Sequence, residues 1–84
     1  MAITNKQVTI TTSPTPLNDA DPDGANMTIK IEDAVYLGNE NVSINNGFLL
    51  DSDEIFDIFI GPNEIFYAMI EDGTTTAYVL MTLC

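Results

Sequence analysis

The sequence predicts an all-β domain, a small antiparallel β-sandwich or barrel of about seven to eight short strands. Short apolar segments alternate with turn residues at the spacing of about 8–12 residues that is typical of such folds. No segment keeps a helical period of apolar residues. A chain of 84 residues has room for one hydrophobic core. We therefore expect residues 1–84 to form a single β-sandwich domain, with residues 1–16 as an N-terminal arm or an edge strand.

Alternation of apolar and polar residues locates the strands. The clearest example is 27–32, where apolar residues at odd positions alternate with polar residues at even positions. Val8 and Ile10 indicate a first strand over 6–12, which ends before Pro14 because proline has no N–H to donate to a sheet. The expected strands are, in order, 6–12, 27–32, 34–37, 42–44, 48–50, 55–60, 65–70 and 76–83.

Asparagine and glycine mark an expected hairpin. Asn45-Asn46-Gly47 lies between the apolar segments 42–44 and 48–50. An Asn-Gly pair readily adopts the positive φ angles that a tight hairpin turn requires. The sequence therefore predicts that 42–44 and 48–50 pair with each other across this turn.

Acidic residues dominate the charge of the chain. Thirteen Asp and Glu residues and only two cations, Lys6 and Lys30, give a net charge of −11. Phosphate groups repel such a surface, so we expect neither nucleic acid nor a membrane as a partner. The sequence has no apolar run of about 18 residues and no apolar core behind a positively charged start. We therefore predict no membrane span and no signal peptide, and synthesis in the cytoplasm.

The residue types of common catalytic and cofactor sites are missing or isolated. The sequence has no His and a single Cys, Cys84, which excludes the usual ligand sets of zinc, haem and iron–sulfur clusters. Ser13, Ser43 and Ser52 have no His to activate them as nucleophiles. We therefore predict that the protein is not an enzyme and has no cofactor.

One acidic turn is similar to the start of a calcium-binding loop. Asp19, Asp21 and Asp23 alternate before Gly24, as the first oxygen ligands of such a loop do. The position of the closing bidentate Glu is occupied by Lys30 instead. Because an acidic Asp/Pro/Gly turn needs no metal, we expect a solvated turn, with a calcium site at the three aspartates as the alternative.

Alternation fails in the last third of the chain, where both faces of several strands are apolar. An antiparallel sheet with one face in water normally has a polar face. Two explanations are open: loops or the N-terminal segment cover the second face, or a second chain does. The residues expected at such an oligomer or partner interface are Phe56, Phe59, Ile65, Phe66, Tyr67, Met69, Ile70, Tyr78, Val79, Met81 and Leu83.

The N-terminal segment carries a further candidate contact, formed by Lys6, Val8 and Ile10. Pro14 and Pro16 separate these residues from the following strands. Two arrangements are open: an arm that pairs with a neighbouring subunit by strand addition, or an edge strand of the domain's own sandwich.

The order of these segments resembles a family of small β-sandwich proteins from the virion gene clusters of tailed bacteriophages, which includes capsid decoration and head-fibre proteins. The resemblance rests on VTITTSPTPL, DPDGANMTIKIEDA, VYLGNENVSINNGFLL and IGPNEIFYAMIEDGTTTAYVLM, which together cover most of residues 8–81. In such proteins these motifs look like turns and core positions and carry no catalytic residues.

The resemblance implies a structural protein of the virion, located on the outer surface of the capsid and synthesised in the host cytoplasm. A decoration, or cement, protein of this kind oligomerises, here as an expected homotrimer, and stabilises the head by binding the major capsid protein. The alternative is a module associated with the tail, neck or fibre that recognises a host surface ligand through residues 38–47 and 61–64.

Overall fold

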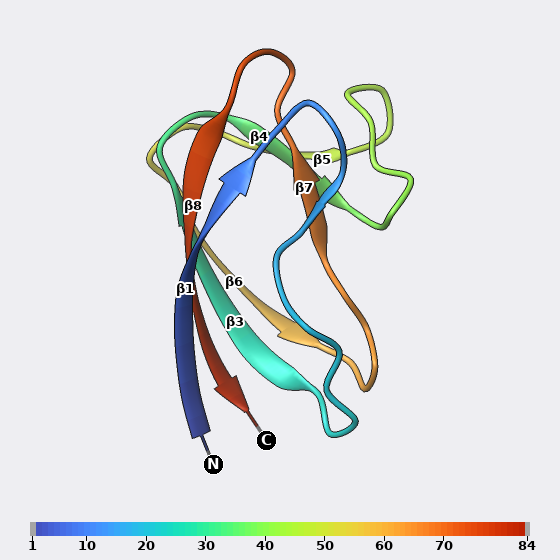
Figure 1. Cartoon of the computed structure of the whole chain (residues 1–84), viewed down its shortest axis with the longest axis vertical. Helices are drawn as coiled ribbons and strands as arrows, with labels where there is room; N and C mark the ends of the chain where they lie inside the picture. The colour runs from blue at the N-terminus through green and yellow to red at the C-terminus, as the bar shows by residue number, and fades with distance from the viewer. Residues whose placement is uncertain (1, 84) are drawn as a thin grey trace.

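Residues 2–83, which the computed structural model describes, form eight β-strands and no helix (Figure 1). The strands are β1 (Ala2–Ile10), β2 (Thr15–Pro16), β3 (Ala25–Ile31), β4 (Val35–Gly38), β5 (Phe48–Leu50), β6 (Ile55–Ile60), β7 (Tyr67–Met69) and β8 (Thr75–Leu83). Among the described residues there is accordingly no helix of the length and apolarity that crossing a membrane takes.

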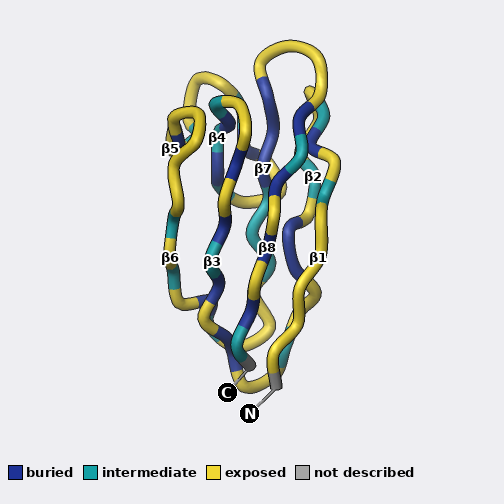
Figure 2. The backbone as a smooth tube through the Cα atoms, turned by 90° about the vertical axis from the view of Figure 1, so that its left-hand side faces the viewer, coloured by how far each residue is buried: buried dark blue, intermediate teal, exposed yellow. Residues whose placement is uncertain are grey.

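The strands form two antiparallel four-stranded sheets. The first sheet has the order β1-β8-β3-β6 and the second the order β2-β7-β4-β5. Figure 2 shows the first sheet in front, with the second sheet behind it. The prediction of an all-β antiparallel sandwich is confirmed, because two such sheets enclose one core between their inner faces.

The core consists of the residues that alternate inward from both sheets. In the first sheet, Ile29 of β3 lies between Phe56 of β6 and Val79 of β8, and neither Ile29 nor Val79 is exposed. The buried apolar cluster comprises Ile10, Leu17, Ala25, Met27, Ile29, Ile31, Val35, Leu37, Leu50, Ile60, Ala68, Ile70, Ala77, Val79 and Met81. Residues between these positions in the strands therefore point outward.

Loops complete the core where the second sheet is short. β2 and β7 have two and three residues, whereas β1 and β8 have nine each. Beyond the end of the second sheet, the segments 17–24 and 61–66 lie over the first sheet (Figure 1). They are held together by backbone hydrogen bonds from the N–H of Leu17 to the C=O of Phe66 (2.8 Å) and from the N–H of Asn63 to the C=O of Asp21 (2.8 Å).

The predicted hairpin between 42–44 and 48–50 is wrong. β5 pairs with β4 instead, with Phe48 opposite Leu37, and residues 39–47 form a loop. Gly47 does not adopt a positive φ. A Cβ atom at Gly47 would lie 2.6 Å from the Cβ of Tyr36, so glycine is needed here for close approach of the chain and not for a hairpin turn.

The strands also differ from the prediction in other ways: β2 was not expected, and β3, β4 and β8 begin or end one or two residues from the predicted bounds. The differences are largest in the first strand and in β7. The first strand runs over 2–10 and not over 6–12, and β7 covers only 67–69 of the expected 65–70. The strand is shorter because the N–H of Phe66 donates to the side chain of Asn18 and the C=O of Phe66 accepts from Leu17. Phe66 is therefore bonded to a loop and not to a neighbouring strand.

Candidate functional site

The outer face of the first sheet exposes large apolar side chains, and we refer to it as the bare face. Its side chains follow from the register of the sheet, because they alternate with the core residues of the four strands. They are Ile3, Asn5, Gln7 and Thr9 of β1, Thr76, Tyr78, Leu80 and Thr82 of β8, Asn26, Thr28 and Lys30 of β3, and Ile55, Asp57 and Phe59 of β6.

Five of these side chains are large, apolar and exposed. The exposed fractions are 72% for Ile3, 64% for Ile55, 57% for Phe59, 48% for Leu80 and 40% for Tyr78. The middle of the bare face forms an open groove of about 600 Å³, lined by residues that include Thr28, Lys30, Ile55, Tyr78 and Leu80. A soluble monomer rarely exposes this many large apolar groups on one sheet face, so the bare face is the first candidate for a binding surface.

Two hydrogen bonds link polar groups of the bare face. The hydroxyl of Thr28 donates to a carboxylate oxygen of Asp57 on the neighbouring strand. The Tyr78 hydroxyl donates to the carboxylate of Glu32 at 3.4 Å, at the rim of the face just after β3. Lys30 is exposed and lies between Tyr78 and Ile55 in the sheet. The face therefore offers apolar area together with the cation of Lys30, the carboxylate of Asp57 and, at the rim, the carboxylate of Glu32.

The outer face of the second sheet differs, because the loop 39–47 covers part of it. Val42 of this loop is buried, and its side chain lies against Gly38 and Gly47 closely enough that a Cβ at either position would approach it within 3.0 Å. The loop is held by its own polar groups: the amide oxygen of Asn46 accepts the N–H of Ser43 at 2.8 Å. The outer face of the second sheet is thus partly covered by the loop 39–47, whereas within residues 2–83 no loop of this kind covers the bare face.

A second group of exposed apolar side chains lies on β5 and on the loop before it. Ile44, Phe48 and Leu49 are exposed by 44%, 60% and 50%, and we refer to these three as the hairpin patch. Phe48 contacts Phe56 of β6 with the ring centroids 5.7 Å apart, which closes the sandwich between its edge strands β5 and β6. The hairpin patch comes from a different sheet than the bare face.

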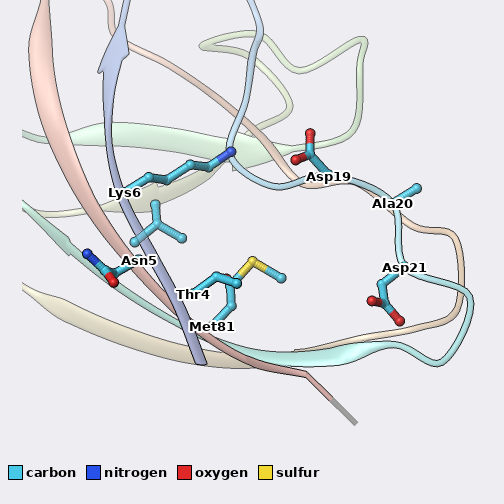
Figure 3. Close-up of a pocket in the computed structure, with 8 residues that line it drawn as sticks. Thr4, Asn5, Lys6, Asp19, Ala20, Asp21 and Met81 are labelled. Atoms are coloured by element: carbon cyan, nitrogen blue, oxygen red, sulfur yellow. The ribbon is translucent and has the colours of Figure 1, made fainter. Parts of the chain in front are cut away.

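A small cleft lies on the inner side of β1, between this strand and the loop of Asp19 and Asp21. Lys6 extends from β1 toward this loop (Figure 3). The cleft has a volume of about 180 Å³ and also contacts Val79 and Met81. Pockets that enclose small-molecule ligands are usually about 300–1,000 Å³, so this cleft is smaller than a typical ligand site.

The structure separates the residues that were expected at an interface. Phe59 and Tyr78 lie on the bare face. Met69, Ile70, Val79 and Met81 are buried in the domain itself, and Phe56, Ile65, Phe66 and Tyr67 are partly buried. The side chain of Leu83 lies outside the described residues. Ile3, Ile55 and Leu80 were missed, and the register of the sheet is what places them outward, with Ile3 opposite Thr82, Ile55 opposite Lys30 and Leu80 opposite Thr28.

The candidate arm residues lie in the edge strand β1. β1 pairs with β8 over nine residues, from Ala2 opposite Leu83 to Ile10 opposite Thr75. Ile10 is buried, Val8 packs partly against the core, and Lys6 is exposed. Residues 2–10 are thus placed as an edge strand of the same chain.

The three aspartates of the acidic turn are not gathered around a common point. The Asp21 carboxylate accepts the N–H of Asp23 at 2.8 Å, an arrangement typical of a simple turn. Within residues 2–83, no group of three or more His, Cys, Asp or Glu side chains is placed so that it could hold a metal ion.

No family model, no curated protein and no solved structure matches this chain.

Proposed function

We infer that this chain is a non-enzymatic structural protein that decorates the outer surface of a tailed-phage capsid. The observation that carries this inference is that an acidic protein exposes large apolar side chains on both of its sheets, on the bare face and in the hairpin patch. A protein that is built into an assembly needs contacts in more than one direction. The resemblance of the sequence to phage virion proteins is the reason for proposing a phage capsid as this assembly.

The charge of the protein suits this role. A net charge of −11 keeps the free protein soluble before it binds. The same charge repels packaged nucleic acid, which favours the outside of a shell over its inner wall. Each copy adds a small buried area, and many copies together stabilise the head.

The hairpin patch is the surface that we assign to the shell, with the major capsid protein as the partner. Leu49 points outward from the edge strand β5, opposite Tyr36, whereas Phe48 lies on the inner side of this strand and remains exposed beside Phe56. The neighbouring loop is fixed by hydrogen bonds within itself. A rigid loop with exposed apolar groups binds with little loss of conformational entropy.

Binding to particles that lack the protein tests this function. The wild-type protein is added to such particles, and the bound copies per particle and the temperature of particle disruption are measured. We expect symmetric coverage of the head and a higher disruption temperature. Leu49→Lys should reduce the bound copies at least tenfold, whereas Glu40→Gln, on the same loop, should not. Particles that bind no copies would contradict the proposal.

A second candidate function rests on the same loop. The side chains of Asn39, Ser43 and Asn46 hold the loop 39–47 in one conformation, which also suits recognition of a host surface ligand by a module of the tail, neck or fibre. The copy number distinguishes the two functions: a few copies at the tail favour recognition, and coverage of the head favours decoration.

A further inference from the structure

The bare face is almost free of charge, although the protein is strongly acidic. Among the strand residues of this face, Lys30 and Asp57 are the charged side chains, and they cancel. Lys6 of the edge strand β1 also lines the groove. Glu32 lies at the rim, where its carboxylate accepts a hydrogen bond from Tyr78. The net charge of −11 is therefore carried by the remaining surface, mostly by the loops at the ends of the strands.

The lack of net charge on the bare face indicates which kind of partner this face fits. A basic partner would be attracted by carboxylates, so a surface built for such a partner has no reason to exclude them. Two copies of this chain, by contrast, repel each other with the charge of −11 that each carries. A surface through which copies associate has to be depleted of carboxylates, and the bare face is depleted in this way.

Pairing through the edges of the first sheet is less favourable than pairing through its face. Lys6 lies on the inner side of the edge strand β1, opposite the buried Val79, and an inward-pointing lysine on an edge strand opposes the addition of another strand. At the other edge, Phe56 of β6 contacts Phe48 of the opposite sheet. The apolar face between the two edges is open.

We propose that the bare face packs against the bare face of a second copy in a twofold symmetric pair. Sheets packed face to face are a common arrangement, with their apolar side chains interdigitated across about 10 Å. Lys30 and Asp57 lie on the adjacent strands β3 and β6, where Thr28 is opposite Asp57 and Lys30 is opposite Ile55. A twofold axis that passes between Lys30 and Asp57 brings the ammonium of each copy to the carboxylate of the other.

The area of the bare face limits the affinity of one copy for another. Strands of nine, nine, seven and six residues, at about 3.3 Å per residue and 4.8 Å between strands, span on the order of 500 Å² in projection. A stable interface buries about 800 Å² on each partner, so we expect a weak pair with a dissociation constant on the order of 10–100 μM. This pairing goes beyond the proposed function, because it needs no shell, and it differs from the homotrimer that the resemblance implies.

Analytical ultracentrifugation of the full chain over a range of about 5 μM to 1 mM tests the proposal. We expect the mass to rise from one chain to two across this range. Leu80→Lys, in the middle of the bare face, should leave the protein folded and monomeric. Ile55→Lys provides a second variant with the same expected result. Leu49→Lys is the matched control, because Leu49 is exposed by 50% and Leu80 by 48%, and it should pair like the wild type.

The charged pair gives an independent readout. Lys30→Glu alone and Asp57→Lys alone should each weaken the pair at least threefold, whereas the double variant, in which the two charges are exchanged, should recover it. A wild-type protein that stays monomeric at 1 mM would overturn the proposal. So would a pair that survives both Leu80→Lys and Ile55→Lys.

The particle assay separates this proposal from the proposed function. A monomeric wild-type protein that still covers the head leaves the function in place and removes the pairing. A protein that pairs as expected but binds no particles leaves the pairing in place and removes the function.

Discussion

The buried side chain of Asn18 provides the hydrogen-bond acceptor for the backbone of Phe66. Its amide oxygen accepts the N–H of Phe66 at 2.8 Å, and its amide nitrogen donates to the C=O of Glu64 at 3.1 Å and to that of Asp19 at 3.0 Å. Asn18 is only 3% exposed. Together with the backbone hydrogen bonds between Leu17 and Phe66 and between Asn63 and Asp21, this side chain holds the segment 17–24 to the segment 61–66, and these two loops cover the core beyond the end of the second sheet.

Asn18→Ala should lower the free energy of unfolding by about 2–3 kcal/mol, because it leaves the Phe66 N–H without its acceptor in a part-buried site. Urea denaturation monitored by circular dichroism measures the change. Asn45→Ala, at an exposed asparagine, should change the free energy of unfolding by less than about 0.5 kcal/mol. If both variants unfold at the same urea concentration, the Asn18 side chain does not hold the two loops together.

Gly24 and Gly73 have similar backbone conformations, and their substitution by alanine gives a second prediction. Both adopt a positive φ, of 79° and 75°, so alanine at either position costs about 1 kcal/mol from the backbone alone. A Cβ at Gly24 would also lie 2.6 Å from the carbonyl oxygen of Ile60, whereas a Cβ at Gly73 would have no atom within 4 Å. Gly24→Ala should therefore destabilise the protein by at least about 2 kcal/mol more than Gly73→Ala does in thermal unfolding. Equal effects of the two substitutions would show that Ile60 can move away at no cost.

The strands with regular alternation were predicted well from the sequence. β3 shows buried residues at every second position, from Ala25 to Ile31, as the apolar pattern of 27–32 indicated. β6 covers 55–60, as expected. In β3 the local pattern also determines which side chains face the core, because successive residues of a strand point to opposite faces. In β6 both faces are apolar, so the pattern gave the bounds of the strand but not its inner face.

The hairpin at Asn45-Asn46-Gly47 could not be predicted in the same way. Its turn signal is a local preference, whereas the observed loop depends on the burial of Val42 against Gly38 and Gly47. Contacts of this kind exist only after the second sheet has formed. Tertiary packing therefore overrode the turn preference.

The candidate site was predicted only in part, for a related reason. In β8, both Tyr78 and Val79 belong to apolar sets, and the sequence does not tell which set faces the core. The register with β3 decides it, because Val79 lies opposite the buried Ile29 and Tyr78 lies opposite Lys30. Phe59 and Tyr78 could therefore be named as surface candidates, but Val79 and Met81 could not be distinguished from them.

Thr75 carries a polar atom in the core. Its hydroxyl oxygen is buried and has no hydrogen-bond partner among the described residues, and its Cα lies opposite that of Ile10. Thr75→Val replaces this hydroxyl by a methyl group of similar shape, so the free energy of unfolding should rise by about 1 kcal/mol. Thr76→Val, on the outer side of the same strand, is the control and should change it by less than about 0.5 kcal/mol. A destabilised Thr75→Val protein would mean that the hydroxyl is satisfied in solution.

The position of Lys6 gives the last prediction. Lys6 is exposed, but its Cα partner in the sheet is the buried Val79, so the side chain belongs to the inner side of the edge strand β1. Figure 3 shows it beside the cleft that lies between β1 and the loop of Asp19. A strand added to the edge of β1 would place its own inner residues next to this ammonium group, which would lose part of its hydration.

Lys6→Val should therefore remove a barrier to association through the edge of β1. We expect species larger than a pair in ultracentrifugation at about 100 μM, because an edge contact can continue from copy to copy. Lys6→Arg keeps the positive charge and should behave like the wild type. A double variant with Lys6→Val and Leu80→Lys cannot pair through the bare face. Any species larger than one chain in this double variant therefore forms through the edge of β1. If Lys6→Val associates no further than Lys6→Arg, the edge of β1 is protected by something other than the lysine.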